Sequence, residues 1–144
     1  ASLTALEVVL LGRMDALHMH VGDELLHEAA SIMAELGIGH LAHRDVMRLS
    51  GGQRQLVMFA QVMLRRPEIL MLDEPTAGVD IALRDMLWTN VRKLNAQGMT
   101  VILTTHYLEE AEALADHVAV IDRGRMVAEG SVARAAARAS ASAS

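Results

Sequence analysis

The feature that most constrains the fold is a run of four apolar residues that ends in two acids. Ile69 to Leu72 carries no polar side chain and is followed by Asp73 and Glu74. Such a continuous apolar strand is typical of a parallel sheet that is covered on both faces. A β-branched strand is expected from Thr100 to Thr104, and an amphipathic helix from Ile81 to Gln97 separates the two. This alternation predicts an α/β fold with a parallel sheet.

Helices dominate the first third of the chain, and the strand–helix alternation continues toward its end. Before Pro67 we expect three helices with caps at Thr4, Asp23 and Ser50 that end near Leu11, Gly37 and Leu64. After Thr104 we expect a helix over Leu108–Ala115, a strand over Val118–Ile121, a turn at Arg123-Gly124 and a strand over Arg125–Ala128. We therefore divide the chain into a partial helical subdomain at 1–48, an α/β core at 49–130 and a low-complexity tail at 131–144, which we expect to be disordered.

Charge and composition exclude several function classes. The net charge is -5 and Lys93 is the single lysine, which argues against nucleic acid as a partner. There is no cysteine, so disulfide and thiolate metal sites are excluded. His18 and His20 lie close together, but no acidic or histidine cluster completes a metal site around them. The apolar runs are too short to span a membrane, so we expect a soluble, cytoplasmic chain that reaches a membrane only through a partner.

The two acids after the first strand are candidates for chemistry on a nucleotide. Ligands bind at the carboxyl ends of the strands in open parallel sheets, and this is where Asp73 lies. We expect the ends of the Ile69–Leu72 and Thr100–Leu103 strands to lie side by side, so that Glu74 and His106 face one cleft. Its carboxylate can hold the Mg²⁺ of a nucleotide, and Glu74 can orient or deprotonate an attacking water. The alternative is that Asp73, Glu74 and Pro75 simply end a strand and begin a turn.

A second candidate is the start of the third helix. Ser50, Gly51, Gly52 and Gln53 place a cap and two glycines at a helix N-terminus. Unpaired backbone N–H groups and the positive end of the helix dipole make such a terminus a site for a phosphate. The alternative is an ordinary serine-capped helix that follows a glycine turn.

Four motifs in this order resemble those of the ATP-binding-cassette (ABC) ATPases. The likeness runs from about Thr4 to Gly130. It implies a P-loop NTPase-like parallel sheet core, present in part, with a helical signature subdomain. The matching segments are Leu49–Gln53 for the signature loop, Ile69–Glu74 for the Walker B strand, Ala77–Asp80 for the D-loop and Thr104–His106 for the switch histidine.

The resemblance implies a role for each candidate residue. Glu74 and His106 would be catalytic, with His106 contacting the γ-phosphate, and Asp73 would bind Mg²⁺. The nucleotide-binding residues would be Ser50, Gly51, Gly52, Gln53 and Asp80. In this family two copies enclose ATP, and the signature loop of each completes the site of the other. Asp80 stands where the family communicates across that dimer.

One expected motif is missing from the sequence. No Gly-x-x-x-x-Gly-Lys-Ser/Thr segment is present, and Lys93 lies in the middle of an amphipathic helix. The opening residues resemble the segment that follows the Q-loop in importers of iron chelates and cobalamin. We therefore expect a C-terminal portion of an ABC ATPase that lacks Walker A.

Three functions remain open from the sequence. The first is an ATP-hydrolysing motor subunit of a membrane transporter, which works with transmembrane permease subunits and a second ATP-binding subunit, as a homodimer or pseudo-dimer. It would lie on the inner face of the cell membrane. The second is a catalytically inactive module for binding or coupling, which the missing Walker A favours. The third is a chromosome-maintenance or repair ATPase, although the chain shows no coiled-coil heptads. The cargo stays open, because the front resembles importers and later segments resemble exporters.

Overall fold

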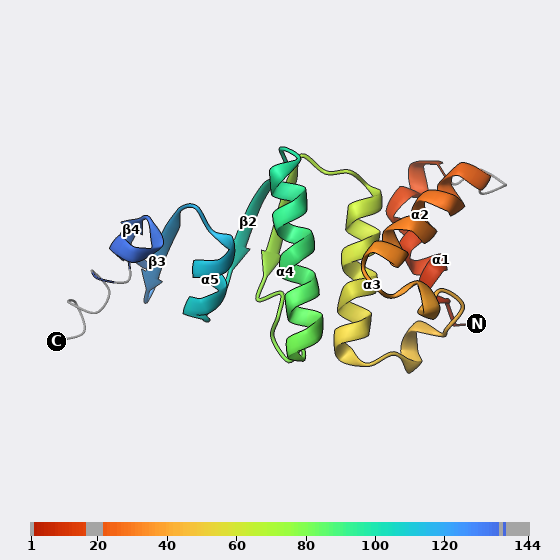
Figure 1. Cartoon of the computed structure of the whole chain (residues 1–144), viewed down its shortest axis with the longest axis horizontal. Helices are drawn as coiled ribbons and strands as arrows, with labels where there is room; N and C mark the ends of the chain where they lie inside the picture. The colour runs from red at the N-terminus through yellow and green to blue at the C-terminus, as the bar shows by residue number, and fades with distance from the viewer. Residues whose placement is uncertain (1, 17–21, 136, 138–144) are drawn as a thin grey trace. The chain divides into compact units, whose positions relative to one another are not determined.

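The computed structural model describes residues 2–16, 22–135 and 137 (Figure 1). His18, His20 and residues 138–144 of the expected tail lie outside the described residues. The chain divides into two compact units. The first comprises Ala1–Met71 and Pro75–Ile102, and the second comprises Leu72–Glu74 and Leu103–Ser144. This division does not coincide with the boundary that the sequence suggested between residues 48 and 49.

The first unit begins with a cluster of helices. The elements are α1 (Ala5–Leu10), the 3₁₀ segment η1 (Leu11–Ala16), α2 (Asp23–Glu35), η2 (Gly39–Leu41), η3 (Val46–Arg48) and α3 (Gly51–Leu64). Helices α1, α2 and α3 pack against one another (Figure 1). Val9, Met33 and Val57 are fully buried, one from each of these three helices. The core of the unit is therefore the apolar stripe that each helix turns toward the other two.

Two of the three predicted helix caps are confirmed. Thr4 and Glu7 form a capping box on α1, and Ser50 and Gln53 form one on α3. The prediction that Asp23 caps the second helix is wrong. Asp23 is the first helical residue of α2, and its side chain makes no cap hydrogen bond. The carboxylate still lies in the first turn, where the helix dipole favours a negative charge.

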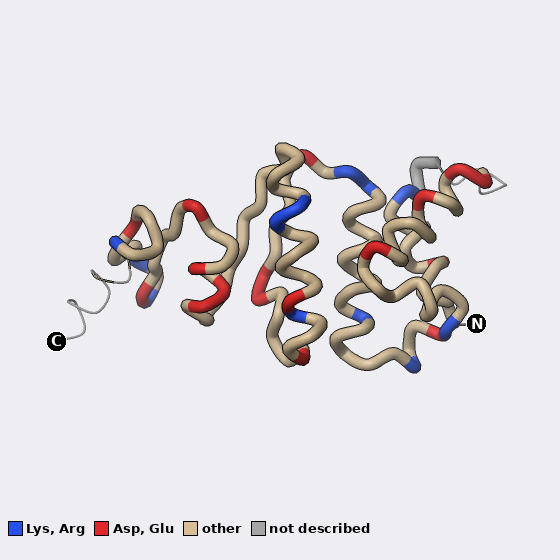
Figure 2. Tube along the Cα trace, in the orientation of Figure 1, with Lys and Arg blue, Asp and Glu red and all other residues tan. Residues whose placement is uncertain are grey.

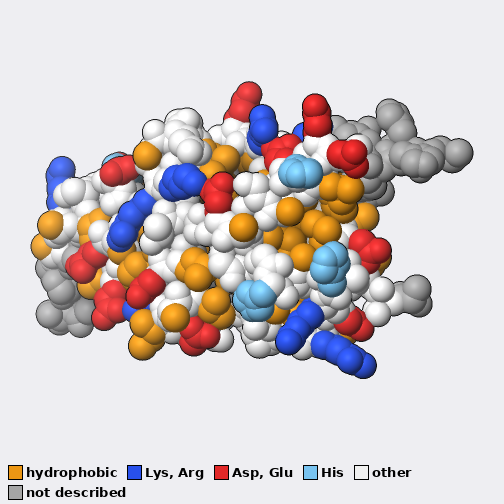
Figure 3. All heavy atoms as spheres, turned by 45° about the vertical axis from the view of Figure 1, so that its right-hand side comes forward, with side chains coloured by type: hydrophobic (Ala, Val, Ile, Leu, Met, Phe, Trp, Pro, Cys, Tyr) orange, Lys and Arg blue, Asp and Glu red, His pale blue; other side chains and the backbone are white. Residues whose placement is uncertain are grey.

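Exposed histidines line the surface of this helical part. His27, His40 and His43 are all exposed, and Figure 3 shows histidine side chains among charged residues on this face. Among the described residues there is no group of three or more His, Cys, Asp or Glu side chains that could hold a metal. His27, His40 and His43 are therefore surface residues.

The remainder of the first unit holds the start of a sheet and a long helix. Strand β1 (Ile69–Asp73) pairs with β2 (Thr100–Thr104), and α4 (Ile81–Ala96) connects them. The two strands run parallel, because Thr100 N–H donates to Glu68 at 3.1 Å and Glu74 N–H donates to Thr104 at 3.0 Å, in the same order along both strands.

The sheet is covered on only one face in this chain. Leu70 is 3% exposed, whereas its neighbour Met71 is 73% exposed. Successive side chains of a strand point to opposite faces, so the exposed set lies on one side. The expectation that both faces would be covered is therefore wrong for the described part of the chain.

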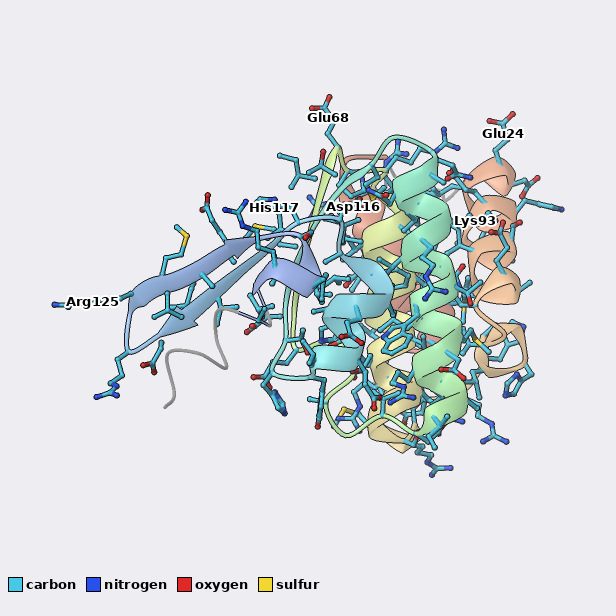
Figure 4. The ribbon with its side chains drawn as sticks, turned by 60° about the vertical axis from the view of Figure 1, so that its left-hand side comes forward. Glu24, Glu68, Lys93, Asp116, His117 and Arg125 are labelled. Carbon is cyan, nitrogen blue, oxygen red and sulfur yellow. The ribbon has the colours of Figure 1, made fainter. Side chains whose placement is uncertain are left out.

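Two ion pairs join α2 to later parts of the first unit. Arg66, just after α3, lies 2.6 Å from Glu28, and Lys93 of α4 lies 2.5 Å from Glu35. Acidic and basic residues are interspersed along the trace (Figure 2), and Lys93 reaches from α4 toward α2 (Figure 4). All four side chains are partly exposed, so these pairs contribute little to stability.

The second unit contains α5 (Leu108–Leu114) and an antiparallel hairpin of β3 (Val118–Asp122) and β4 (Arg125–Gly130). Arg123 and Gly124 both adopt positive φ values, 47° and 76°, which confirms the predicted turn between the strands. Residues 132–135 are helical where the sequence predicted disorder, and Ala135 is 1% exposed. The physical reason is that alanine favours helix and Ala135 N–H donates to Ser131 at 2.9 Å.

Candidate functional site

The acidic pair lies where β1 leaves the sheet. Asp73 is the last residue of β1, and Glu74 follows with a φ of 43°. A residue with a side chain in this left-handed region carries a strain of about 1–3 kcal/mol. The Glu74 N–H donates to the Thr104 carbonyl oxygen at 3.0 Å, so the turn is held by the end of β2. The strained turn directs Glu74 out of the strand geometry that Asp73 still has.

Thr104 contacts both acidic residues. Its hydroxyl donates to Asp73 Oδ1 and accepts from the Glu74 N–H at 3.3 Å. The sequence had marked Thr104 as the end of the second strand and as the first residue of the switch-histidine segment, without a contact to the acids. A hydroxyl residue at the carboxyl end of a strand next to the Asp73 strand is the signal that could have identified it.

His106 lies beside Glu74. Its Nδ1 is 3.4 Å from Glu74 Oε1, and both side chains are more than half exposed. The Tyr107 ring packs on the imidazole with a centroid distance of 4.0 Å and an interplanar angle of 38°. Tyr107 is fixed in turn by its N–H, which donates to Thr105 Oγ1 at 3.0 Å. The predicted adjacency of the two strand ends, with Glu74 close to His106, is confirmed.

This group of side chains suits a hydrated cation that arrives with a phosphate ligand. Asp73 and Glu74 are exposed and supply hard oxygen atoms, which Mg²⁺ prefers. The described residues contain no cluster of three metal-ligating side chains. Mg²⁺ typically binds through one or two carboxylates together with substrate phosphates, and this pattern fits Asp73.

The signature segment lies in the first unit, at the N-terminus of α3. Ser50 Oγ accepts from Gln53 N–H at 3.2 Å, and Ser50 N–H donates to Gln53 Oε1 at 3.1 Å. Helix geometry leaves the N–H groups of Gly51 and Gly52 without acceptors inside the helix. The helix dipole adds positive potential at the same point. The segment therefore offers backbone donors suited to an anion.

The D-loop residues lie next to this segment within the same unit. A Cβ on Gly52 would stand 2.8 Å from Leu83 Cδ1 and 3.7 Å from Val79 Cγ1. A side chain at position 52 would therefore require the Leu83 side chain to shift, so the start of α3 lies close to the start of α4. Asp80 caps α4 through a 2.9 Å hydrogen bond from the Leu83 N–H to its carboxylate. The first unit thus brings Asp80 and Gly52 into one region.

Gln55 adds a contact that the sequence did not indicate. Its side-chain amide donates to the carbonyl oxygen of Pro75 and is partly buried. Pro75 follows Glu74 directly, so the helix that begins with the signature residues is tied to the loop that leaves the acidic pair. The sequence signal that could have identified it is that Gln55 lies two residues after the signature loop.

The structure gathers the predicted site residues in two groups. Asp73, Glu74 and His106 belong to the second unit, and the signature residues and Asp80 belong to the first. A parallel strand whose carboxyl end carries two acids and a helix N-terminus that presents backbone donors are both features of α/β nucleotide-binding proteins.

Comparison with known proteins supplies the family. Residues 3–77 match the ABC transporter family, and the chain belongs to it. The daunorubicin/doxorubicin resistance ATP-binding protein DrrA of Streptomyces peucetius is 41% identical over 85% of the chain, and the match covers 36% of that protein. The cobalt import ATP-binding protein CbiO of Rhodobacter capsulatus is 48% identical over 70% of the chain, and again 36% of that protein is covered. The chain thus spans about a third of the length of these relatives.

Solved structures agree with this assignment. The ADP conformation of MJ1267, an ATP-binding cassette of an ABC transporter, superposes with a TM-score of 0.75 at 30% identity, covering 90% of this chain and 56% of that one. A nucleotide-free ATP-binding cassette from an ABC transporter gives a TM-score of 0.77 at 28% identity, with the same coverage. Within the part of the chain that the structure describes, no helix is long and apolar enough to cross a membrane.

Proposed function

We propose that this chain is part of an ATPase that drives a membrane transporter. The end of β1 would supply the residues for hydrolysis, and the start of α3 would supply the signature segment. The observation that carries the proposal is the 3.4 Å contact between His106 Nδ1 and Glu74 Oε1, beside Asp73 at the ends of neighbouring parallel strands. Asp73 would hold Mg²⁺ on the nucleotide phosphates. Glu74 would accept a proton from the attacking water, and His106 would contact the γ-phosphate.

The signature segment would serve the nucleotide of a second ATP-binding subunit. Ser50, Gly51 and Gly52 present a hydroxyl and backbone N–H groups at the start of a helix, and Gln53 closes the capping box. Donors of this kind stabilise the negative charge of a phosphate group. Asp80 caps the next helix beside Gly52, so it is placed to respond when the signature segment engages a phosphate.

The partners would be transmembrane permease subunits and a second ATP-binding subunit, at the inner face of the cell membrane. Family membership supports this, because the relatives are named as ATP-binding proteins of a cobalt import system and of a Nod factor export system. Their names include both import and export. We therefore assign no cargo to the chain, since one ATPase fold serves many substrates.

Substituting Glu74 with Gln tests the proposal. The assay uses a complete ATP-binding cassette in which this chain follows the phosphate-loop part of an ABC ATP-binding subunit. The amide keeps the shape of the side chain and cannot accept a proton. We expect ATP binding to be retained and the hydrolysis rate to fall by about 10²–10⁴.

The matched control is Glu112→Gln, which makes the same change at an exposed position of α5 outside the acidic pair. Its turnover should equal that of the unmodified cassette. Unchanged turnover in Glu74→Gln would show that Glu74 does not activate the water.

A further inference from the structure

The end of β1 has to hold two consecutive acids in different orientations. Asp73 keeps the extended geometry of the strand, and Glu74 turns into the left-handed region with a φ of 43°. Such a conformation persists only where neighbouring groups hold it in place. The groups that hydrogen-bond to the Glu74 N–H belong to Thr104 of the adjacent strand.

Three hydrogen bonds join Thr104 to the acidic pair. Its carbonyl oxygen accepts from the Glu74 N–H at 3.0 Å, and its hydroxyl oxygen accepts from the same N–H at 3.3 Å. The hydroxyl hydrogen is donated to Asp73 Oδ1. A threonine hydroxyl offers one donor and two acceptor sites, so it can make both contacts at once. β-Branching also restricts the rotation of the side chain, which fixes the direction of the hydroxyl.

We propose that Thr104 is a positioning residue for hydrolysis, which sets the orientation of the Asp73 carboxylate and of the Glu74 backbone relative to each other. The proposal rests on the function proposed above for Asp73 and Glu74. Thr104 contacts neither nucleotide nor water in this role, and it acts through the two acids. The Asp73 carboxylate is held in one rotation, ready to take part in binding Mg²⁺ together with the phosphates.

Because the three residues are exposed, an effect on hydrolysis can be distinguished from an effect on folding stability. Thr104, Asp73 and Glu74 are all exposed, so water can replace the hydroxyl as a hydrogen-bond partner when it is removed. Folding stability should therefore change little when the hydroxyl is lost. The orientation of the carboxylate, in contrast, depends on a partner in one fixed position.

Three substitutions in the complete cassette test the proposal. Thr104→Val removes the hydroxyl and keeps the shape of the side chain, whereas Thr104→Ser keeps the hydroxyl. Thr100→Val is the control, because it makes the same Thr-to-Val change outside the site. Thr100 lies four residues earlier on β2 and therefore on the same face of the strand. The readouts are kcat, KM for ATP, the Mg²⁺ concentration that gives half-maximal rate, and the thermal unfolding midpoint. Mn²⁺ binding in the presence of a non-hydrolysable ATP analogue, followed by electron paramagnetic resonance, supplies a readout that needs no turnover.

We expect Thr104→Val to lower kcat by about 10–100-fold and to weaken Mn²⁺ binding and raise the Mg²⁺ requirement, as is typical when a partner of a metal ligand is lost. KM for ATP and the unfolding midpoint should stay close to those of the unmodified cassette. Thr104→Ser should retain most of the activity, and Thr100→Val should retain all of it.

Several outcomes would overturn the proposal. Unchanged kcat and Mn²⁺ binding in Thr104→Val would do so, as would equal losses in Thr104→Ser and Thr104→Val. If Thr104→Val does not fold, Thr104→Ala is measured against Thr104→Ser by the same criteria. The Glu74→Gln variant is measured alongside. A loss of turnover there with none in Thr104→Val would reject the role of Thr104 and leave the proposed function standing, whereas full turnover in Glu74→Gln would reject the proposed function itself.

Discussion

At the scale of single residues, Glu7 shows how local hydrogen bonds lower the pKa of a carboxyl group. The Thr4 backbone N–H donates to the carboxylate at 2.7 Å and the Thr4 hydroxyl donates to it at 2.8 Å. These bonds, the backbone one first, hold the pKa of Glu7 below its ordinary value of 4.5. A carboxyl whose pKa is lowered by folding stabilises the folded state above its unfolded pKa. This contribution is lost as the pH falls through the lower, folded value.

The Glu7→Gln substitution measures that contribution. Glutamine can occupy the same capping position but carries no charge to titrate. We expect the unmodified chain to unfold at a higher temperature than Glu7→Gln at pH 7, and the difference to shrink as the pH falls below about 4.5. Thermal unfolding followed by circular dichroism at several pH values checks this. A difference that stays constant from pH 7 to pH 3 would contradict it. Asp45, whose pKa is also lowered, is unchanged in both proteins and cancels from the comparison.

Local patterns at this scale were largely readable from the sequence. The spacing of Thr4 to Glu7 predicted a capping box, and Ser50 was predicted as a cap of the third helix. The structure has a capping box at both positions, because Gln53 also lies three residues after Ser50. Asp23 was misplaced by one residue, since Gly22 takes the cap position with extended backbone. A capping prediction rests on the first residue of the helix, and sequence patterns locate that residue only to within one or two positions.

At the scale of elements, η1 packs so closely against α3 that the contact requires a glycine at position 12. Gly12 is buried, and a Cβ at this position would clash with the carbonyl oxygen of Gln61 in α3. The clash is with backbone, which cannot rotate away as a side chain can. We expect Gly12→Ala to destabilise the chain by about 1–3 kcal/mol, the usual cost of overpacking.

The control is Gly22→Ala, because nothing lies within 4 Å of a Cβ there. Chemical denaturation of both variants, fitted to a two-state transition, gives the two free energies of unfolding. Gly22→Ala should change stability by clearly less than Gly12→Ala. Equal effects would mean that the loss of glycine itself, rather than the contact with α3, determines the outcome.

The order of elements was predictable and their burial was not. The apolar run from Ile69 to Leu72 and the β-branched run from Thr100 to Thr104 became the strands β1 and β2, because runs this short, flanked by Pro or Gly, favour a strand over a helix. The exposure of Met71 followed from no local feature. Whether a strand face is covered depends on segments distant in the sequence, and a continuous apolar run predicts cover on both sides.

At the scale of the whole molecule, the residues of the candidate site were predicted through their motifs, and the backbone turn and hydrogen bonds that hold them were not. The order of the motifs identified Asp73, Glu74 and His106, and parallel topology predicted that they would share one sheet edge. The left-handed turn at Glu74 and the contacts of Thr104 were not predicted. These features depend on the register of β1 against β2, which the pattern of residues does not specify when both strands are mostly apolar.

The chain alone lacks the segment that holds most of the phosphate charge of ATP in P-loop enzymes. The sequence contains no Gly-x-x-x-x-Gly-Lys-Ser/Thr segment, and its single lysine, Lys93, is on α4 in an ion pair with Glu35. In P-loop enzymes that segment and its lysine surround the β- and γ-phosphates, which carry most of the charge of ATP. In the function proposed above, Asp73 and His106 would offer one contact to the metal and one to a phosphate, and the donors around Gly51 would serve the nucleotide of a partner subunit.

We therefore expect the isolated chain to bind ATP weakly or not at all and to show no Mg²⁺-dependent hydrolysis above background. Calorimetric titration of ATP with Mg²⁺ into the purified chain, after gel filtration has shown a single species, is the measurement. The complete cassette titrated under the same conditions is the control, because its added phosphate loop should restore binding. Micromolar, Mg²⁺-dependent binding by the isolated chain would contradict the prediction. The Asp73→Asn variant would then show whether that binding uses the metal site proposed at the end of β1, since it should weaken binding only if Mg²⁺ is held there.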